Sequence, residues 1–118
     1  MTQEDKELLI KDLCARLPYK VKVCLYGKET CILMGIDGNE VYLDVDSDSF
    51  RIESIKPYFR PMSSMTEEEW KEYRDINCCL TKDCDAWDEI DWLNAHHFDY
   101  RGLIPMNLAL EAPEGMYN

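Results

Sequence analysis

The feature that most constrains the fold is a series of three turns between residues 19 and 54. Turn-forming residues occupy positions 27–28, 37–38 and 46–49, and the segments between them are rich in Val, Ile, Leu and Tyr. Loops of two, two and four residues at these positions would fold the segment into consecutive antiparallel hairpins. The sequence therefore predicts a β-meander, and with it an architecture built around a sheet.

Those loop lengths set a register in which all three hairpins share one apolar face. A shift of one residue would turn a strand over and expose that face, so agreement across three turns favours this register. We therefore expect Val23, Ile32 and Leu43 to point into the core. The predicted opposing pairs are Val21 with Met34, Val23 with Ile32, Leu25 with Thr30, Thr30 with Val45, Ile32 with Leu43, Met34 with Val41, Leu43 with Ile52 and Val45 with Phe50.

A helix is predicted before the meander, over residues 3–16. Thr2 can cap its first turn, and Asp5 three residues later completes a weaker form of the capping box. Pro18 ends the helix, because the residue before a proline is pushed out of the helical conformation. The expected apolar stripe of this helix consists of Ile10, Leu13, Cys14 and Leu17.

The fold class that follows is α+β. We expect residues 1–62 to form the N-terminal helix and a small antiparallel barrel of SH3-like or Sm-like type, because a barrel buries the apolar face of a meander. Pro57 cannot donate a ladder hydrogen bond, so residues 56–60 would lie at a sheet edge or follow a short helical kink. Residues 63–118 would form an acidic helical region with two helices and an ordered tail, packed on the barrel as one compact unit.

Charge is distributed unevenly along the chain, whose formal net charge is −11. Residues 1–62 hold 9 basic and 11 acidic side chains, and residues 63–118 hold 4 basic and 13 acidic ones. An acidic surface repels phosphate backbones, so nucleic-acid binding is disfavoured for the second half. Such a surface is commonly a solubility device, and the sharper alternative is attraction to a basic partner protein.

Membrane and redox signals point to a cytoplasmic protein. No apolar run is long enough to cross a membrane, and no signal-peptide pattern begins the chain. The six cysteines are therefore expected to be reduced, with Cys24 and Cys31 facing each other as free thiols in the first hairpin. Cys78, Cys84 and His96 are only weak candidates for a zinc site, because the thiols lack paired C-x2-C spacing. Nothing in the sequence indicates a cofactor.

Two further helices are predicted in the acidic half. Thr66 and Glu69 have the spacing of a capping box at the start of the first of them. The second is expected over residues 86 to about 97, with Asp85 as its cap and with Ala86, Ile90, Leu93 and His97 on its apolar stripe. The aromatic residues expected to bind a partner are Trp70, Tyr73, Trp87 and Trp92.

Residues 92–102 hold both histidines of the chain beside an Asp, a Tyr and an Arg, the one place where acid–base chemistry is conceivable. No nucleophile elbow or cysteine dyad accompanies them, so a structural junction is favoured over a catalytic site. Arg101 is expected to pair with a carboxylate such as Asp99 or to cap the helix that precedes it. The weak catalytic candidates are His96, His97, Asp99 and Arg101.

Two long blocks of the chain resemble a known family. Residues 56–69 read KPYFRPMSSMTEEE, and residues 91–104 read DWLNAHHFDYRGLI, followed by LALEAPEGMY at 108–117. These blocks, about half of the chain, resemble segments of a family of small uncharacterised proteins of phages, prophages and mobile elements in gut anaerobic bacteria. The resemblance implies a cytoplasmic accessory protein of a mobile element, and it assigns no catalytic residue.

The sequence favours a non-enzymatic function by protein–protein interaction. We expect a phage- or mobile-element-encoded accessory protein that binds a host or phage protein with a basic surface, for example as its inhibitor. Two alternatives stay open. One is a small nucleic-acid-associated Sm-like module that uses Lys20 and Lys22, and the other is a hydrolase or nuclease that uses His96, His97 and Asp99. Small barrels often associate through edge strands, so a homo-oligomer is also compatible with the sequence.

Overall fold

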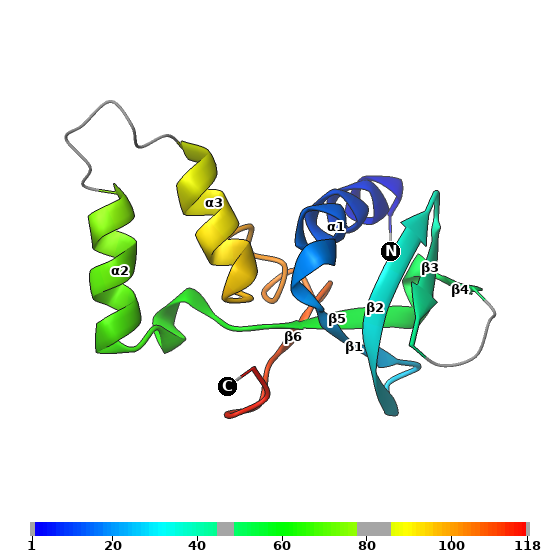
Figure 1. The fold of residues 1–118 in the computed structure, drawn as a ribbon. Coiled ribbons are helices and arrows are strands. Elements are labelled where there is room, and N and C mark those ends of the chain that lie inside the picture. Colours follow the sequence, from blue (N-terminus) through cyan, green and yellow to red (C-terminus); the bar gives the residue numbers. More distant parts are fainter. Residues whose placement is uncertain (1, 45–48, 78–85, 118) are drawn as a thin grey trace.

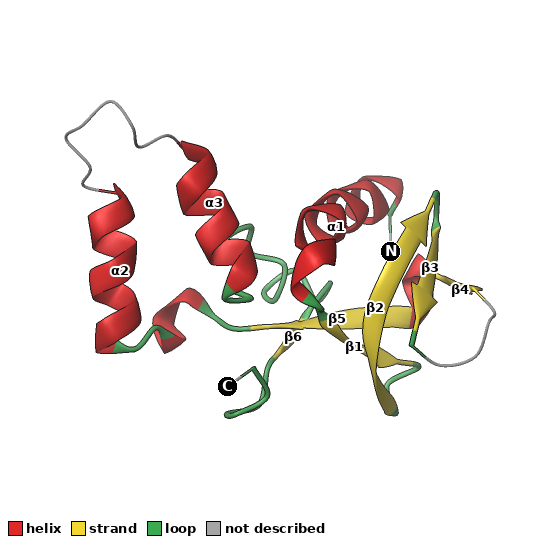
Figure 2. Cartoon of the chain, in the orientation of Figure 1, coloured by secondary structure: helices red, strands yellow, loops and turns green. Residues whose placement is uncertain are grey.

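The computed structural model describes residues 2–44, 49–77 and 86–117. Over these residues the chain is α+β, as the sequence predicts, with an N-terminal α-helix, a six-stranded sheet and two further α-helices (Figures 1 and 2). Within the same residues, no helix has both the length and the apolar content that a membrane span requires.

The sheet consists of β1 (Lys22–Leu25), β2 (Glu29–Asp37), β3 (Glu40–Leu43), β4 (Ser49–Arg51), β5 (Ile55–Phe59) and β6 (Leu110–Glu111). Its strand order is β4-β3-β2-β1-β5-β6, and neighbouring strands are antiparallel except for β5 and β6. The described strands form an open sheet with β4 and β6 at its edges. The α-helices are α1 (Gln3–Arg16), α2 (Glu67–Asn77) and α3 (Ala86–Ala95).

Helix α1 lies against the sheet, and α2 and α3 stand side by side at one end of the molecule (Figure 1). A short 3-10 helix at Ile52–Ser54 separates β4 from β5, which is the kink given as one alternative around Pro57. The other alternative, an edge position, is wrong because β5 lies between β1 and β6. Strand β6 pairs only with Tyr58 and Phe59, so the missing N–H group of Pro57 falls outside that ladder.

The register of the first hairpin differs by one residue from the predicted one. Val23 opposes Cys31 rather than Ile32. The turn is formed by Tyr26 and Gly27, whose φ angles of 54° and 71° are both positive, as a type I′ turn requires. The loop between the strands therefore contains three residues, 26–28, instead of the predicted two, and the extra residue turns β2 over relative to the prediction.

A run of four apolar residues at positions 31–34 explains why the register was predicted wrongly. Because this run does not alternate with polar residues, either face of β2 could be buried, and only the turn decides between them. In the structure Cys31 and Leu33 are buried, Ile32 is half-buried, and Met34 is 64% exposed.

The other two hairpins also differ from the prediction. A β-bulge after Leu33 shifts β2 against β3, so that Leu33 opposes Leu43 and Ile36 opposes Val41. Val41 in turn opposes Phe50 of β4. An extra residue in one strand cannot be read from apolar spacing alone, because it changes the facing pairs without changing the composition.

Much of the predicted core is confirmed despite these shifts. Ile52 is buried within the 3-10 helix rather than opposite Leu43 in a strand. Val45, which two of the predicted pairs contain, lies outside the described residues. The predicted inward-facing residues that are buried are Val21, Val23, Leu25, Val41, Leu43 and Ile52.

Helix α1 begins and ends where predicted, and its capping box is present. The Thr2 hydroxyl accepts a hydrogen bond from the Asp5 backbone N–H at 3.1 Å, and the Asp5 carboxylate accepts one from Thr2 N at 3.4 Å. The predicted stripe is wrong in part, because Ile10 and Leu17 are only half-buried and Cys14 is exposed. The buried residues are Leu9, Asp12, Leu13 and Arg16.

The described cysteines Cys14, Cys24 and Cys31 are free thiols. The shifted register places Cys24 opposite Thr30, so Cys24 and Cys31 do not face each other as predicted. Both are buried in the sheet, and burial raises the pKa of the Cys31 thiol. A protonated thiol behaves as a small apolar side chain, which suits these positions.

Helix α3 ends at Ala95, two residues before the predicted end. His97 N donates to Asn94 O at 3.1 Å and Phe98 N donates to Leu93 O at 3.0 Å, the hydrogen-bond pattern of a Schellman cap. His97 has the φ angle of 63° that this cap requires and that glycine usually supplies. His97 therefore terminates the helix and is not part of its apolar stripe.

The tail after α3 is ordered and packs on the rest of the chain, as expected. Leu103, Leu108 and Ala109 are buried in the same core as α1 and the sheet. Strand β6 then lies beside β5, and the residues that follow lie below these two strands in the view of Figure 1 (red).

The observed register predicts opposite outcomes for two neighbouring residues of β2. We expect Leu33→Ala to lower the free energy of unfolding by about 2–5 kcal/mol, because it leaves a cavity in the core. Met34→Ala should change it by no more than about 0.5 kcal/mol, since the side chain is largely exposed. Denaturant unfolding of the two variants measures both values, and the reverse order would support the register first predicted from the turns.

Candidate functional site on the helical arm

A buried arginine connects α1 to the segment that follows α3. Arg16 has no exposed surface, and its guanidinium donates to Asp12 at 2.8 Å and to the Phe98 carbonyl oxygen at 2.6 Å. Arg101 donates to the other oxygen of Asp12 at 2.9 Å. The Arg16 guanidinium also lies 4.0 Å from the centre of the Phe59 ring in β5. These contacts hold the base of α3 against α1 and the sheet.

Helices α2 and α3, together called the helical arm, begin with a well-formed cap. Thr66 N donates to Glu69 Oε1 at 3.0 Å, and Glu69 N donates to Thr66 Oγ1 at 3.2 Å, so the predicted capping box is present. Glu67 and Glu68 in the same turn are exposed, where their charges complement the helix dipole. Asp85, the predicted cap of α3, lies outside the described residues.

Glu69 also anchors the arm to the end of β5. Arg60 donates to both of its carboxylate oxygens at 2.7 Å, and the side chains of the pair are only 18% and 15% exposed. The hydrogen bonds from Arg60 lower the pKa of Glu69 from its ordinary 4.5 to about 2. The Arg60 guanidinium lies 4.3 Å from the centre of the Phe98 ring and also donates to the Ser64 carbonyl oxygen.

A row of aromatic rings extends from Phe98 to the surface of the arm. The Phe98 ring stacks on Trp92 with centroids 5.8 Å apart, and Trp92 lies 5.6 Å from Tyr73. Tyr73 stacks on Trp70 at 5.8 Å, and Trp70 is 52% exposed. Such offset contacts stabilise aromatic pairs beyond the area that they bury. The row therefore holds an exposed indole ring on a support that reaches into the core.

Polar groups fix the rings of this row in place. The Tyr73 hydroxyl donates to Glu89 at 2.6 Å, and Trp92 Nε1 donates to Glu72 at 3.2 Å, so both bonds cross between α2 and α3. Trp87, also expected to bind a partner, lies in α3, but its side chain is outside the described part of the chain.

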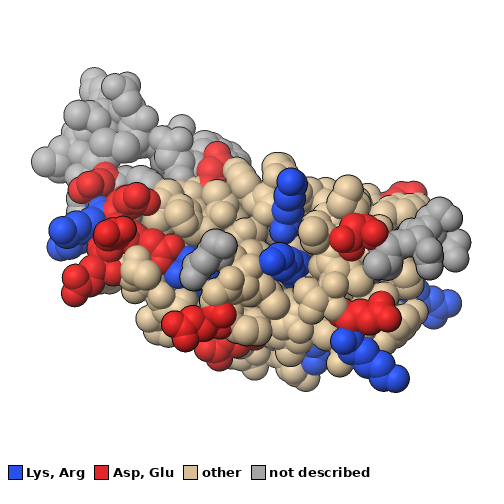
Figure 3. Space-filling model, turned by 60° about the horizontal axis from the view of Figure 1, so that its bottom comes forward, with Lys and Arg blue, Asp and Glu red and all other residues tan. Residues whose placement is uncertain are grey.

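The surface around Trp70 is acidic. Helix α2 contains five acidic residues and two basic ones, and all except Glu69 are exposed. Figure 3 shows acidic side chains gathered at the end of the molecule that carries α2. The arrangement combines an exposed, rigidly supported aromatic ring with uncompensated negative charge, which suits contact with a cationic surface.

The weak catalytic candidates are held in separate contacts. The His96 ring packs at a tilt against Trp92, with centroids 4.2 Å apart, and its Nδ1 lies 3.4 Å from Glu69, whereas His97 stacks on Tyr117 at 3.7 Å. Asp99 accepts backbone N–H bonds at 2.9 Å from residues 103 and 104, and Arg101 pairs with Asp12 rather than with Asp99. The two histidine rings therefore have different neighbours, and the four side chains do not converge on one site.

Of the three weak candidates for a metal site, only His96 belongs to the described residues. Cys78 and Cys84 lie outside the described residues. His96, the third candidate, lies beside Glu69 and Trp92. Among the described residues, no group of three or more His, Cys, Asp or Glu side chains is arranged to hold a metal ion.

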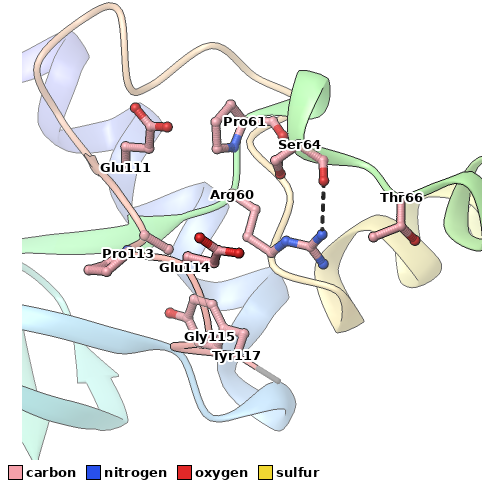
Figure 4. Close-up of a pocket in the computed structure, with 10 residues that line it drawn as sticks. Arg60, Pro61, Ser64, Thr66, Glu111, Pro113, Glu114, Gly115 and Tyr117 are labelled. Carbon is pink, nitrogen blue, oxygen red and sulfur yellow. Dashed lines mark hydrogen bonds between the residues drawn. The ribbon is translucent and has the colours of Figure 1, made fainter.

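A cavity of about 390 Å³ lies beside Arg60, at the base of the arm (Figure 4). Ser64 and Thr66 lie on one side of it, and Glu114 and Tyr117 of the C-terminal segment lie on the other. In Figure 4 the Arg60 side chain reaches across to the Ser64 carbonyl oxygen. The cavity separates the arm from the C-terminal segment.

Sequence reasoning found the helix cap and the aromatic residues but missed the two arginines that position them. Arg60 lies inside the block 56–69 that resembles a known family, but the sequence predicted no partner for it. Glu69 was predicted only to be part of a helix cap. Spacing carried no signal for their pairing, because Arg60 reaches Glu69 across a bend in the chain rather than along one helix face. Arg16 gave no signal because a charged residue is rarely fully buried.

Comparison with protein-family models, with curated proteins and with solved structures finds no match to this chain. What the protein does is therefore inferred from its own residues.

The Arg60–Glu69 pair predicts a pH dependence of stability. Because the pKa of Glu69 is lower in the folded protein than in the unfolded chain, the pair contributes its full stabilisation above about pH 4.5 and loses it as the pH falls toward 2. We expect Glu69→Gln to lower the free energy of unfolding by about 1.5–3 kcal/mol at neutral pH, as for hydrogen bonds to charged groups. The difference from the wild type should shrink below pH 4.5.

Urea unfolding at a series of pH values measures this difference. Glu68→Gln, which removes an exposed carboxylate from the same turn, is the matched control and should show little change at any pH. A Glu69→Gln deficit that stays constant down to about pH 2 would show that the carboxylate is not held ionised by Arg60.

Proposed function

We propose that this protein is a non-enzymatic interaction protein that binds a partner with a basic surface through the exposed face of α2. Trp70 would be the central contact of this interface, and the exposed acidic side chains of α2 would surround it. By this proposal the partner is a host or phage protein whose activity the binding could inhibit. The observation that carries the proposal is the 52% exposure of Trp70 within an acidic surface.

An exposed Trp supported by other rings has the properties of an interface hot spot. Tryptophan is enriched at such positions because it buries a large area at a small cost in side-chain entropy. Here the ring stacks on Tyr73, which itself contacts Trp92, so the indole is already ordered before binding. Pre-organisation of this kind favours affinity, since little freedom remains to be lost.

The charge on α2 would contribute mainly to the rate of association and to partner choice. Negative potential attracts a basic surface over several ångströms and repels nucleic acid. The alternative of a nucleic-acid-binding module has less support. One of its two expected lysines, Lys22, is already engaged, because its ammonium group donates a hydrogen bond to the Met116 carbonyl oxygen at 2.8 Å.

The biological context belongs to the same proposal. The resemblance of residues 56–69, 91–104 and 108–117 to phage and mobile-element proteins supports an accessory protein that acts in the cytoplasm. The order β4-β3-β2-β1-β5, with a 3-10 turn before β5, supports an SH3-like or Sm-like arrangement of these five strands. Domains of this size commonly act as binding modules and carry their function in surface sites.

A capture experiment tests the proposed interface. Immobilised protein would be exposed to lysate of a candidate host, and the bound proteins would be compared between about 0.1 M and about 1 M salt, where the Debye length falls from about 10 Å to about 3 Å. We expect a basic partner that is retained at low salt and lost at high salt. Trp70→Ala should weaken its binding by about thirtyfold, since a hot-spot residue contributes about 2 kcal/mol.

Matched variants separate the α2 surface from general effects of charge and exposure. Glu67→Gln with Glu68→Gln removes two charges from α2, and Glu29→Gln with Asp37→Asn removes two exposed charges from β2. Only the double substitution in α2 should slow the association of the protein with its partner. Met34→Ala is the control for Trp70→Ala, because the Met34 side chain is also more than half exposed but lies on the sheet. Equal capture by wild type and Trp70→Ala would contradict the proposal.

A further inference from the structure

Residues 112–117, here called the C-terminal strap, lie between two cavities. One is the cavity of about 390 Å³ beside Arg60 (Figure 4), and the other, of about 560 Å³, adjoins Lys22 and Asp44. Residues 113–115 line both of them and are exposed. The strap is therefore a narrow wall between two cavities, with solvent access at its centre.

The strap is held mainly at its two ends. At one end, the Ala112 N–H group donates to the Phe59 carbonyl oxygen at 2.7 Å. At the other end, the Tyr117 hydroxyl accepts from the Lys22 N–H group at 2.9 Å and donates to the Tyr58 carbonyl oxygen at 2.7 Å. A single phenol thus satisfies one backbone group of β1 and one of β5.

The Tyr117 ring rests on His97, which caps α3. The two rings are nearly parallel, with an interplanar angle of 13° and centroids 3.7 Å apart. The Nδ1 atom of His97 is buried and has no hydrogen-bond partner among the described residues. A neutral imidazole tolerates this position far better than an imidazolium, whose second N–H group would be left unsatisfied.

Positive groups face His97 from the elements packed around it. They are Arg16 of α1, Lys22 of β1 and Arg60 after β5, and the carboxylates of Asp12 and Glu69 are already engaged by the arginines. The imidazole of His96 is a further neighbour of His97. Burial, followed by these charges, lowers the pKa of His97 from its ordinary 6.5 to about 4. Protonation in place would therefore add a fourth cation to the partly desolvated cluster of Arg16, Lys22 and Arg60.

We propose that the C-terminal strap is a latch that is closed while His97 is neutral and opens when His97 is protonated. The other elements around His97 are parts of helices and the sheet, whereas the strap is tied by few hydrogen bonds and is exposed at its centre. Its departure would hydrate the imidazolium and join the two cavities into one trough across β1 and the end of β5. This inference does not depend on the partner of the helical arm.

The direction of the pH effect follows from the lowered pKa of His97. Its neutral state stabilises the closed strap fully above about pH 6.5, and this stabilisation is lost as the pH falls toward 4. The latch should therefore be closed at neutral pH and open in mildly acidic solution.

Amide hydrogen exchange followed by NMR tests the latch in the chain of residues 1–118. The Lys22 and Ala112 amides report on the strap, because their N–H groups bond to Tyr117 and across to β5. The Leu33 amide, which donates to Val21 O at 2.9 Å within the sheet, reports on global unfolding. Between about pH 7 and about pH 4 we expect the protection factors of Lys22 and Ala112 to fall at least about tenfold, while that of Leu33 is maintained.

Two variants separate the latch from ordinary acid sensitivity. His97→Asn cannot titrate and accepts a positive φ, so its strap protection should not change over this pH range. Tyr117→Phe removes the bridging hydroxyl and should lower Lys22 protection about tenfold at neutral pH, as expected for one lost hydrogen bond. The proposal is overturned if Leu33 loses protection together with Lys22, or if His97→Asn follows the wild-type pH course.

Discussion

The burial of the Arg16 guanidinium is the constraint on which the rest of the structure depends. A cation without exposed surface must find acceptors inside the protein, because an unpaired buried charge costs several kcal/mol. Asp12, one turn earlier on α1, supplies a carboxylate, and the Phe98 carbonyl oxygen supplies a second acceptor from 82 residues away. Helix α1 therefore cannot dock correctly without the segment that follows α3.

Phe98 connects the buried Arg16 to both the proposed partner-binding surface and the proposed latch. Its carbonyl oxygen accepts a hydrogen bond from Arg16, while its ring contacts both Arg60 and Trp92. From Trp92 the aromatic row leads to the exposed Trp70, and the residue before Phe98 is the histidine beneath the strap. The surface proposed for partner binding and the proposed latch thus share one support, although they lie on different parts of the molecule.

The sequence predicted best those features that depend on neighbouring residues. Both capping boxes, at Thr2 and Thr66, were correct because a cap is decided within four residues. The existence of the meander was also predictable, but its register was not. Four consecutive apolar residues at 31–34 fit either face of β2, and the bulge after Leu33 leaves no trace in the apolar pattern.

The parts of the site that could not be predicted involve residues far apart in the chain. The predicted apolar stripe of α1 was wrong in part, because the structure buries Asp12 and Arg16 beside Leu13. The second arginine partner of Asp12, Arg101, lies 89 residues away. In the same way, the aromatic residues of α2 and α3 could be named, but not the row that they form. Tyr117 belongs to a block that resembles a known family, but the sequence predicted no structural role for it, because its contacts with β1 and β5 span 95 and 59 residues.

The most direct test of this account is the stability of Arg16→Met, which keeps much of the side-chain volume but removes the charge. Removing one partner of a buried pair leaves Asp12 and the Phe98 carbonyl oxygen short of donors, so the free energy of unfolding should fall by about 3–5 kcal/mol. Lys6→Met, which breaks the surface pair with Glu53, is the control and should change stability far less. Similar small losses in both variants would contradict the claim that the buried arginine organises the fold.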